Sequence, residues 1–98
     1  MERYSTRHID EVNRITLPIE IRKRLVLETD SIVILQPIGN IVVVQKKNEK
    51  KIKYFHSKVN QLGKIEFSDE LMRNMNWKHE DGIAIYHVDD GMVILKVA

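Results

Sequence analysis

The chain has 98 residues, of which 43% are hydrophobic and 31% are charged, a balance typical of one small folded domain and not of a disordered segment. It contains no cysteine, which excludes disulfides, cysteine-zinc sites and thiol nucleophiles. The formal charge of +2 is too small to indicate a nucleic-acid partner by itself. Neither a membrane-length apolar run nor a charged leader is visible, so we expect a cytoplasmic protein with no membrane span.

Two segments of the chain are similar to each other, residues 7–46 and residues 57–96. Their apolar positions coincide while their charged positions differ, as expected after duplication of one packing unit. We align them with one residue inserted in the second segment between the helix and the last two strands, which gives these pairs: Ile9 with Val59, Val12 with Leu62, Ile15 with Ile65, Leu25 with Met75, Asp30 with Asp81, Ile32 with Ile83 and Ile34 with Ile85. The chain is therefore divided into two repeats, residues 1–50 and 51–98.

The first repeat is expected to begin with a short strand around Ile9. A turn follows at residues 12–14, where Asn13 tolerates a positive φ as Gly63 does in the second repeat. After a second short strand, the pattern predicts a helix of about two turns with Pro18 at its first position. A helix this short is stable only if its apolar side is packed.

The first repeat then ends in two strands, residues 31–36 and 41–46, which are predicted to form a hairpin around the turn at residues 37–40. Their apolar runs do not alternate with polar residues, so we expect both faces of these strands to be covered. Residues 46–53 contain five lysines in eight positions. This stretch is interpreted as a solvated connector, with a phosphate-contacting segment as the alternative.

The second repeat follows the same order. Its helix is expected to be capped by Ser68, with acidic residues in the first turn, and its hairpin covers residues 83–88 and 92–97. An open two-stranded hairpin cannot cover both of its own faces, so the hairpins must close against each other or against a second chain. The predicted fold class is mainly β with short helices.

The order strand, hinge turn, strand, short helix and hairpin accompanies the sequence D-E-V-N-R-I-T-L-P-I-E-I-R-K-R-L at residues 10–25. This combination resembles the AbrB family (SpoVT/AbrB-like) of looped-hinge-helix transcription factors, closely over residues 7–47 and in degenerate form over residues 57–97. The tandem arrangement is similar to that of the MraZ proteins. The resemblance implies a swapped-hairpin β-barrel built from two tandem hinge-helix-hairpin repeats of βαβ type, and a bacterial regulator that binds double-stranded DNA.

The resemblance also implies which residues contact DNA: Arg7 in the first strand, Arg14 in the hinge, and Arg22, Lys23 and Arg24 in the helix. Independently, five of the six arginines lie in the first quarter of the chain, and arginine suits bidentate contact with phosphate or guanine. The alternative for each arginine is a solvated or ion-paired surface residue. Arg14 would then pair with Asp10, and Arg24 with Glu20.

The chain departs from the family pattern at several positions. Val26 stands where the family has a glycine after the helix, and since valine enters the left-handed region only at a cost, we expect the helix to end differently here. In the second repeat Asn60 and Lys64 replace the hinge Asp and Arg, and Met72 replaces the helix arginine. We expect this repeat mainly to complete the fold, and a homodimer to place two basic repeats on one pseudo-palindromic operator.

Two other functions compete with transcriptional regulation. An antitoxin of a toxin-antitoxin pair is expected to carry an extended toxin-binding tail, whereas this sequence ends at Ala98 just after the last strand. A protein-interaction module would dock a protein partner through Met72, Met75 and Trp77 of the second repeat, although apolar residues at helical spacing are more often core. No catalytic motif or zinc spacing is visible, so we predict neither an enzyme nor a metal or cofactor site.

Overall fold

The computed structural model describes residues 2–47, 55–89 and 91–98, which form eight strands and two short helices. The first half contributes β1 (Glu2–His8), β2 (Arg14–Thr16), α1 (Ile19–Arg24), β3 (Ile32–Ile38) and β4 (Ile41–Lys46). The second half contributes β5 (Phe55–Lys58), β6 (Lys64–Glu66), α2 (Asp69–Met75), β7 (Gly82–Asp89) and β8 (Met92–Val97). The protein is therefore mainly β with short helices, and the same order of elements occurs in each half. Most of the lysine-rich connector, residues 48–53, and the turn residue Asp90 lie outside the described part.

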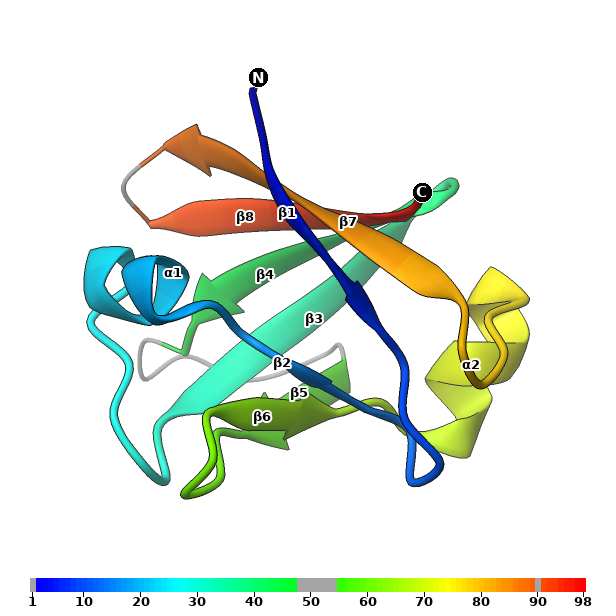
Figure 1. Ribbon diagram of the computed structural model, residues 1–98, viewed down its shortest axis with the longest axis horizontal. Coiled ribbons are helices and arrows are strands. Elements are labelled where there is room, and N and C mark those ends of the chain that lie inside the picture. Colours follow the sequence, from blue (N-terminus) through cyan, green and yellow to red (C-terminus); the bar gives the residue numbers. More distant parts are fainter. Residues whose placement is uncertain (1, 48–54, 90) are drawn as a thin grey trace.

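The strands form a six-stranded antiparallel sheet in the order β1-β7-β8-β4-β3-β5 and a two-stranded ribbon of β2 and β6. The two halves are interleaved in both. The first strand of each half pairs with the hairpin of the other, β1 with β7 and β5 with β3, and β4 pairs with β8. Figure 1 shows α1 and α2 at opposite sides of the view, with β1, the edge strand of the large sheet, crossing in front of β7 and β8. No helix in the described residues is long and apolar enough to cross a membrane.

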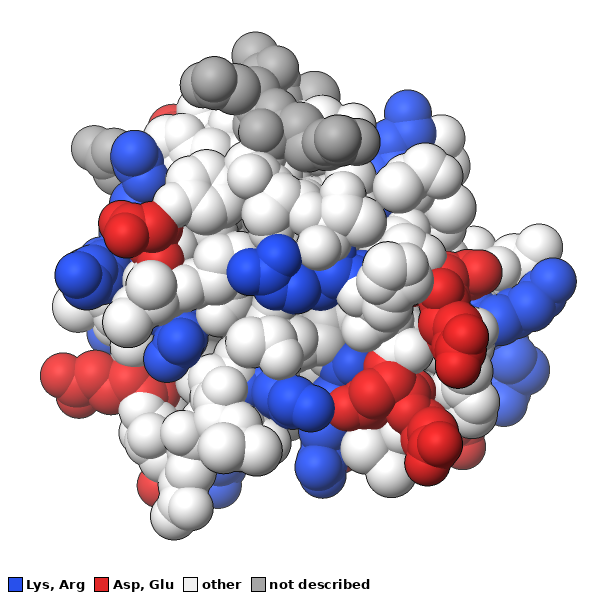
Figure 2. All heavy atoms as spheres, in the orientation of Figure 1, with Lys and Arg blue, Asp and Glu red and all other residues white. Residues whose placement is uncertain are grey.

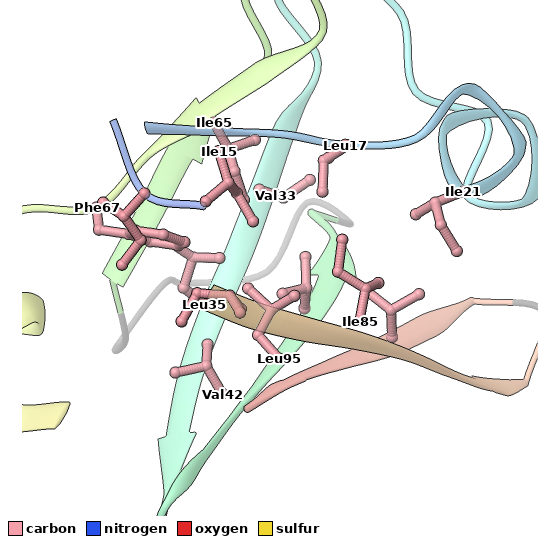
Figure 3. Close-up of a cluster of buried hydrophobic side chains, with 14 of the residues drawn as sticks. Ile15, Leu17, Ile21, Val33, Leu35, Val42, Ile65, Phe67, Ile85 and Leu95 are labelled. Carbon is pink, nitrogen blue, oxygen red and sulfur yellow. The ribbon is translucent and has the colours of Figure 1, made fainter. Parts of the chain in front are cut away.

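A single hydrophobic core lies between the ribbon and the large sheet. Ile15 of β2 and Ile65 of β6 point toward Val33 and Leu35 of β3, as Figure 3 shows. All four side chains are at most 1% exposed. Burial of this apolar surface is the main term that stabilises a domain of this size.

The hairpin strands alternate between buried and half-buried residues. In β3 and β4 one face is fully buried, whereas Ile34 and Val43 on the other face remain half-buried. Both faces of these strands were expected to be covered, and at these two residues the cover is partial. The first hairpin turn is also shorter than predicted, because β3 continues to Ile38. Pro37 lies within β3, where it is opposite Val42 of β4.

The two helices begin differently. Pro18 is the N-cap residue of α1 and not its first helical residue, because its ψ of 147° is outside the helical range. Ser68 caps α2 as predicted, with its Oγ accepting a hydrogen bond from the Leu71 N–H at 3.1 Å. The prediction of short helices with a packed side is confirmed, since Ile21 and Leu71 are both fully buried.

The alignment of the two halves needs a correction. Asp30 and Glu80 both have positive φ, 73° and 72°, and each donates its backbone N–H to the end of the other half's first strand, at Val59 and Ile9. Asp30 therefore corresponds to Glu80 and not to Asp81. The predicted insertion between helix and hairpin is wrong.

The inserted residue is instead a β-bulge in the second hairpin. The register of β7 against β8 shifts between His87 and Asp89, which is the signature of one extra residue in one strand. Up to this bulge the buried Val33 and Leu35 correspond to the buried Ile83 and Ile85. The sequence alignment had placed Ile32 and Ile34 at these positions.

The end of α1 also differs from the expectation. Val26 has a φ of 55°, and the N–H groups of Val26 and Leu27 donate to the carbonyls of Lys23 (3.1 Å) and Arg22 (2.7 Å). These two bonds form a Schellman motif with valine in the left-handed position. The helix therefore ends in the conformation that glycine usually adopts at this position. Valine adopts it here in spite of the steric cost to its β-branched side chain.

Val26→Gly is expected to raise the free energy of unfolding by about 1 kcal/mol, because the relief of left-handed strain exceeds the entropy cost of glycine. Little packing is lost, since Val26 is 64% exposed. The matched control is Asn76→Gly at the end of α2, where φ is 58°. Asparagine tolerates this region, so the control is expected to change stability by only a few tenths of a kcal/mol. Urea denaturation measures both, and a Val26→Gly protein no more stable than the wild type would contradict the strain.

Candidate nucleic-acid interface

Both hinge turns are held by the same side-chain geometry. Asp10 Oδ1 accepts hydrogen bonds from the N–H groups of Val12 (3.0 Å) and Arg14 (2.9 Å). Asn60 Oδ1 accepts two equivalent bonds, from Leu62 and Lys64, both at 2.9 Å. The replacement of Asp by Asn in the second half therefore keeps the turn, since either side chain can make it.

The predicted positive φ in each turn is confirmed at Asn13 (64°) and Gly63 (76°). The carbonyl of each residue accepts a hydrogen bond from the strand end of the other half, Gly63 from Leu17 and Asn13 from Phe67, both within 2.9 Å. Each turn is thereby bonded to the segment that leads into the helix of the opposite half.

Asp10 is also ion-paired across the halves. Its Oδ2 lies 3.2 Å from Lys64 Nζ. Burial raises the pKa of the Asp10 carboxyl, but the hydrogen bonds from Arg14 and Val12 and the charge of Lys64 outweigh it and hold the pKa below its ordinary value of 3.8. The ionised carboxylate is therefore the form that the folded hinge favours.

The lowered pKa of Asp10 makes stability depend on acidity. The stabilisation is complete above the unfolded-state pKa near 3.8 and is lost as pH falls through the lower folded-state value. Asp10→Asn keeps the turn bonds that Asn60 already makes but cannot titrate, so its free energy of unfolding is expected to fall less steeply than that of the wild type below about pH 4. Chemical denaturation at a series of pH values measures this, and identical acid dependence of the two proteins would contradict the assignment.

Arg14 is paired with an acidic residue that the sequence did not indicate. Its Nε and Nη2 lie 3.3 and 3.2 Å from Glu66 Oε1, across the β2–β6 ribbon. The alternative pairing with Asp10 is wrong, because Asp10 contacts the Arg14 backbone and the Lys64 side chain. The Arg14 and Glu66 side chains are 40% and 55% exposed, so their ion pair contributes at most about 1 kcal/mol and is readily exchanged for another anion.

Arg22 and Lys23 lie together on one surface. They line a shallow depression of about 350 Å³ with Ile19, Val26, Leu27 and Glu28. Arg22 Nε donates to the Leu17 carbonyl at 3.0 Å, whereas neither Nη atom has a hydrogen-bond partner among the described residues. Lys23 is exposed. The depression therefore offers two cations with free donors.

The other predicted contact residues lie apart from this depression. Arg7 is on β1 and bonds to Ser5 Oγ at 2.9 Å. The exposed Arg24 lies 3.4 Å from His87 Nε2 and forms no ion pair with Glu20. Figure 2 shows Lys and Arg side chains spread over the middle and both sides of the face in view, with acidic side chains among them at the left and in a larger group at the right and lower right. Of the five predicted residues, Arg22 and Lys23 line this depression together.

The corresponding depression at α2 has different chemistry. It has a volume of about 420 Å³, and Asp69, Met72 and Asn76 line it at the positions of Ile19, Arg22 and Val26. Asn13 connects two residues of this lining. Its Nδ2 donates to Asp69 Oδ1 at 3.0 Å, and its Oδ1 lies 3.0 Å from His79 Nε2. The described residues include no group of three or more His, Asp or Glu side chains that could hold a metal ion.

The apolar residues of the second helix region belong to the core. Met72 and Trp77 are 7% and 5% exposed, and Phe67 meets Trp77 edge to face with ring centroids 5.2 Å apart. Met75 is partly buried against the same cluster. A protein partner that docked through these three residues would therefore meet side chains that are mostly buried.

No protein-family model matches the sequence, and no curated protein matches it. Among solved structures, the chain is similar to the solution structure of PHS018 from Pyrococcus horikoshii, with a TM-score of 0.56 and 18% sequence identity. The similarity covers 96% of this chain and 87% of that one. It shows a shared fold.

Proposed function

We propose that this protein is a sequence-specific, double-stranded DNA-binding transcriptional regulator of the AbrB type, with the swapped-hairpin β-barrel of that family. The exchange of first strands between the halves, β1 onto β7 and β5 onto β3, supports this fold. The two hinge turns, each followed by a short strand and a short helix, support it as well. Residues 1–50 and 51–98 are then two AbrB-like repeats, of which the second is degenerate.

The observation that carries the proposal is the depression at α1. Arg22 and Lys23 line it together, and Arg22 keeps both Nη groups available while its Nε is held by Leu17. Such a pair of cations can bind adjacent phosphates and orient the protein on a duplex. Arg7, Arg14 and Arg24 are further DNA contacts in this proposal, and Arg14 becomes available when it exchanges Glu66 for phosphate.

The two halves of one chain are unequal. The second presents Met72 where the first presents Arg22, and it is bridged by the Asn13–Asp69 bond. We therefore expect one strong and one weak half-site per chain. A cytoplasmic homodimer would bring two strong halves onto one pseudo-palindromic operator.

The proposal is tested by wild-type binding to mixed-sequence duplex DNA across a salt series. We expect affinity to fall steeply with salt, because each phosphate contact releases condensed counterions. Binding to single strands should be weaker, since Tyr4 is the one large aromatic side chain that is exposed among the described residues, which gives no row of aromatic rings for base stacking. Absence of duplex binding at low salt would overturn the proposal.

Glu66→Gln is expected to raise duplex affinity a few-fold. The substitution removes a negative charge and frees Arg14, whose guanidinium lies 3.2 Å from the Glu66 carboxylate. Glu70→Gln on α2 changes the charge equally at an exposed residue that forms no ion pair with Arg14 in the described part of the chain, and should have a smaller effect. Electrophoretic mobility shifts compare the variants, and equal effects of the two would mean that Arg14 takes no part in binding.

A further inference from the structure

We propose that Gly63, from the second half of the chain, is a positioning residue for the guanidinium of Arg22, from the first half. The inference rests on the proposed DNA-binding function and adds a residue to the same site. The surface that carries Arg22 and Lys23 is then built by both halves of the chain. The first half supplies the cations, and the second half supplies the turn that positions one of them.

Gly63 and Arg22 are linked through one residue between them. The Leu17 N–H donates to the Gly63 carbonyl at 2.9 Å, and the Leu17 carbonyl accepts from Arg22 Nε at 3.0 Å. Leu17 is fully buried. Its two backbone groups therefore fix the Arg22 side chain against the hinge turn of the other half.

The guanidinium lies face-on against Gly63. A Cβ placed on Gly63 would be 2.6 Å from Arg22 Cζ, 2.8 Å from Nε and 2.9 Å from Nη1. Because the central carbon is nearer than either nitrogen, this position is over the flat face of the group and not in its plane. Any side chain at residue 63 would occupy the space that the guanidinium needs.

In this orientation the Nη edge of the Arg22 guanidinium has no hydrogen-bond partner among the described residues. With Nε bonded to Leu17 and one face covered by Gly63, the Nη1 and Nη2 groups are the donors that remain. A fixed pair of such donors matches two acceptors side by side, which on duplex DNA are the oxygens of a phosphate or O6 and N7 of a guanine. Preorganisation reduces the entropy lost when these bonds form.

The other half of the molecule lacks this arrangement. Asn13 takes the place of Gly63 with a similar positive φ, 64° against 76°, and Met72 takes the place of Arg22. A side chain is thus compatible with the turn backbone, and where one is present the helix position equivalent to Arg22 carries methionine. The need for glycine at residue 63 comes from Arg22 as well as from the turn.

Gly63→Asn tests the proposal, because Asn13 shows that this backbone accepts asparagine. The new Cβ meets only the end of a flexible side chain, so the fold should survive while the guanidinium is displaced. We expect duplex affinity to fall about tenfold in Gly63→Asn and in Arg22→Ala, and the double variant to bind no more weakly than Arg22→Ala. The positioning role would be overturned if Gly63→Asn lowered duplex affinity by the same factor in the wild type and in Arg22→Ala. It would also be overturned if Gly63→Asn bound duplex as tightly as the wild type.

A readout without DNA separates this inference from the proposed function. The Nε–H of Arg22 should give a slowly exchanging NMR signal in the wild type that is lost in Gly63→Asn. If the wild type binds no duplex, the proposed function fails. The NMR comparison of the wild type with Gly63→Asn then still tests whether Gly63 positions the Arg22 side chain. An unprotected Nε–H in the wild type would overturn it.

The same variants identify the acceptor that Arg22 meets. A loss that is uniform across duplex sequences, with the salt slope reduced by about one, assigns Arg22 to phosphate. A loss confined to duplexes with guanine at one position assigns it to a base edge. Either result supports the pair of free donors, whereas no loss in Arg22→Ala on any duplex contradicts it.

Discussion

Replacing Phe67 with alanine is expected to lower the free energy of unfolding by about 3 to 5 kcal/mol. Phe67 is fully buried and packs edge to face on Trp77. It follows β6 directly, and its N–H donates to the Asn13 carbonyl at 2.8 Å, so its side chain anchors the junction between the ribbon, α2 and the opposite hinge. A domain of this size has only about 5 to 15 kcal/mol of stability, so the loss is expected to leave the protein close to unfolding.

Urea denaturation followed by circular dichroism measures this loss. Leu62→Ala removes a side chain that is 71% exposed and should change stability by no more than about 0.5 kcal/mol. Phe67→Leu keeps an apolar side chain and should cost about 1.5 kcal/mol, which gives a measurable value if the alanine variant does not fold. A Phe67→Leu protein as stable as the wild type would contradict the anchoring role.

Local features of the fold could be predicted from local sequence. Ser68 indicated the start of α2 because a hydroxyl before an acidic first turn is a strong cap. Asn13 and Gly63 indicated positive φ because few residues tolerate it. In each case the determining contacts lie within a few residues of the chain.

Features that depend on distant partners could not be predicted. In the run from Ile32 to Leu35 every residue is apolar, so a slip of one position leaves the pattern unchanged. The extra residue was therefore assigned to the segment before the hairpin, when it lies in the bulge between His87 and Asp89. The pairing of β1 with β7 is likewise set by tertiary packing and leaves no local trace.

Some residues of the candidate site could likewise be predicted from local sequence, and others could not. Arg22 and Lys23 could be identified by residue type and spacing on one helix. Glu66 and Gly63 could not, because each reaches its arginine only when the two halves interleave and β6 pairs with β2. The strain at Val26 was misjudged because the hydrogen bonds at the end of α1 outweigh the preference of one side chain.

The double variant Arg14→Ala, Arg22→Ala is expected to lower duplex affinity by about 100-fold, because each charged contact contributes roughly a factor of ten. Neither side chain is part of the core. The Arg14 ion pair with Glu66 is exposed, and Arg22 contributes one hydrogen bond to Leu17. The fold is therefore expected to persist, and circular dichroism checks it.

The most direct test of DNA recognition by the first half is the salt dependence of duplex binding by this double variant. The slope of log affinity against log salt should be shallower than that of the wild type by about two. Arg73→Ala removes an exposed arginine of α2 and should keep the wild-type slope. If the folded double variant keeps the wild-type affinity and slope, or if Arg73→Ala weakens binding as much, the first half does not contact DNA as proposed.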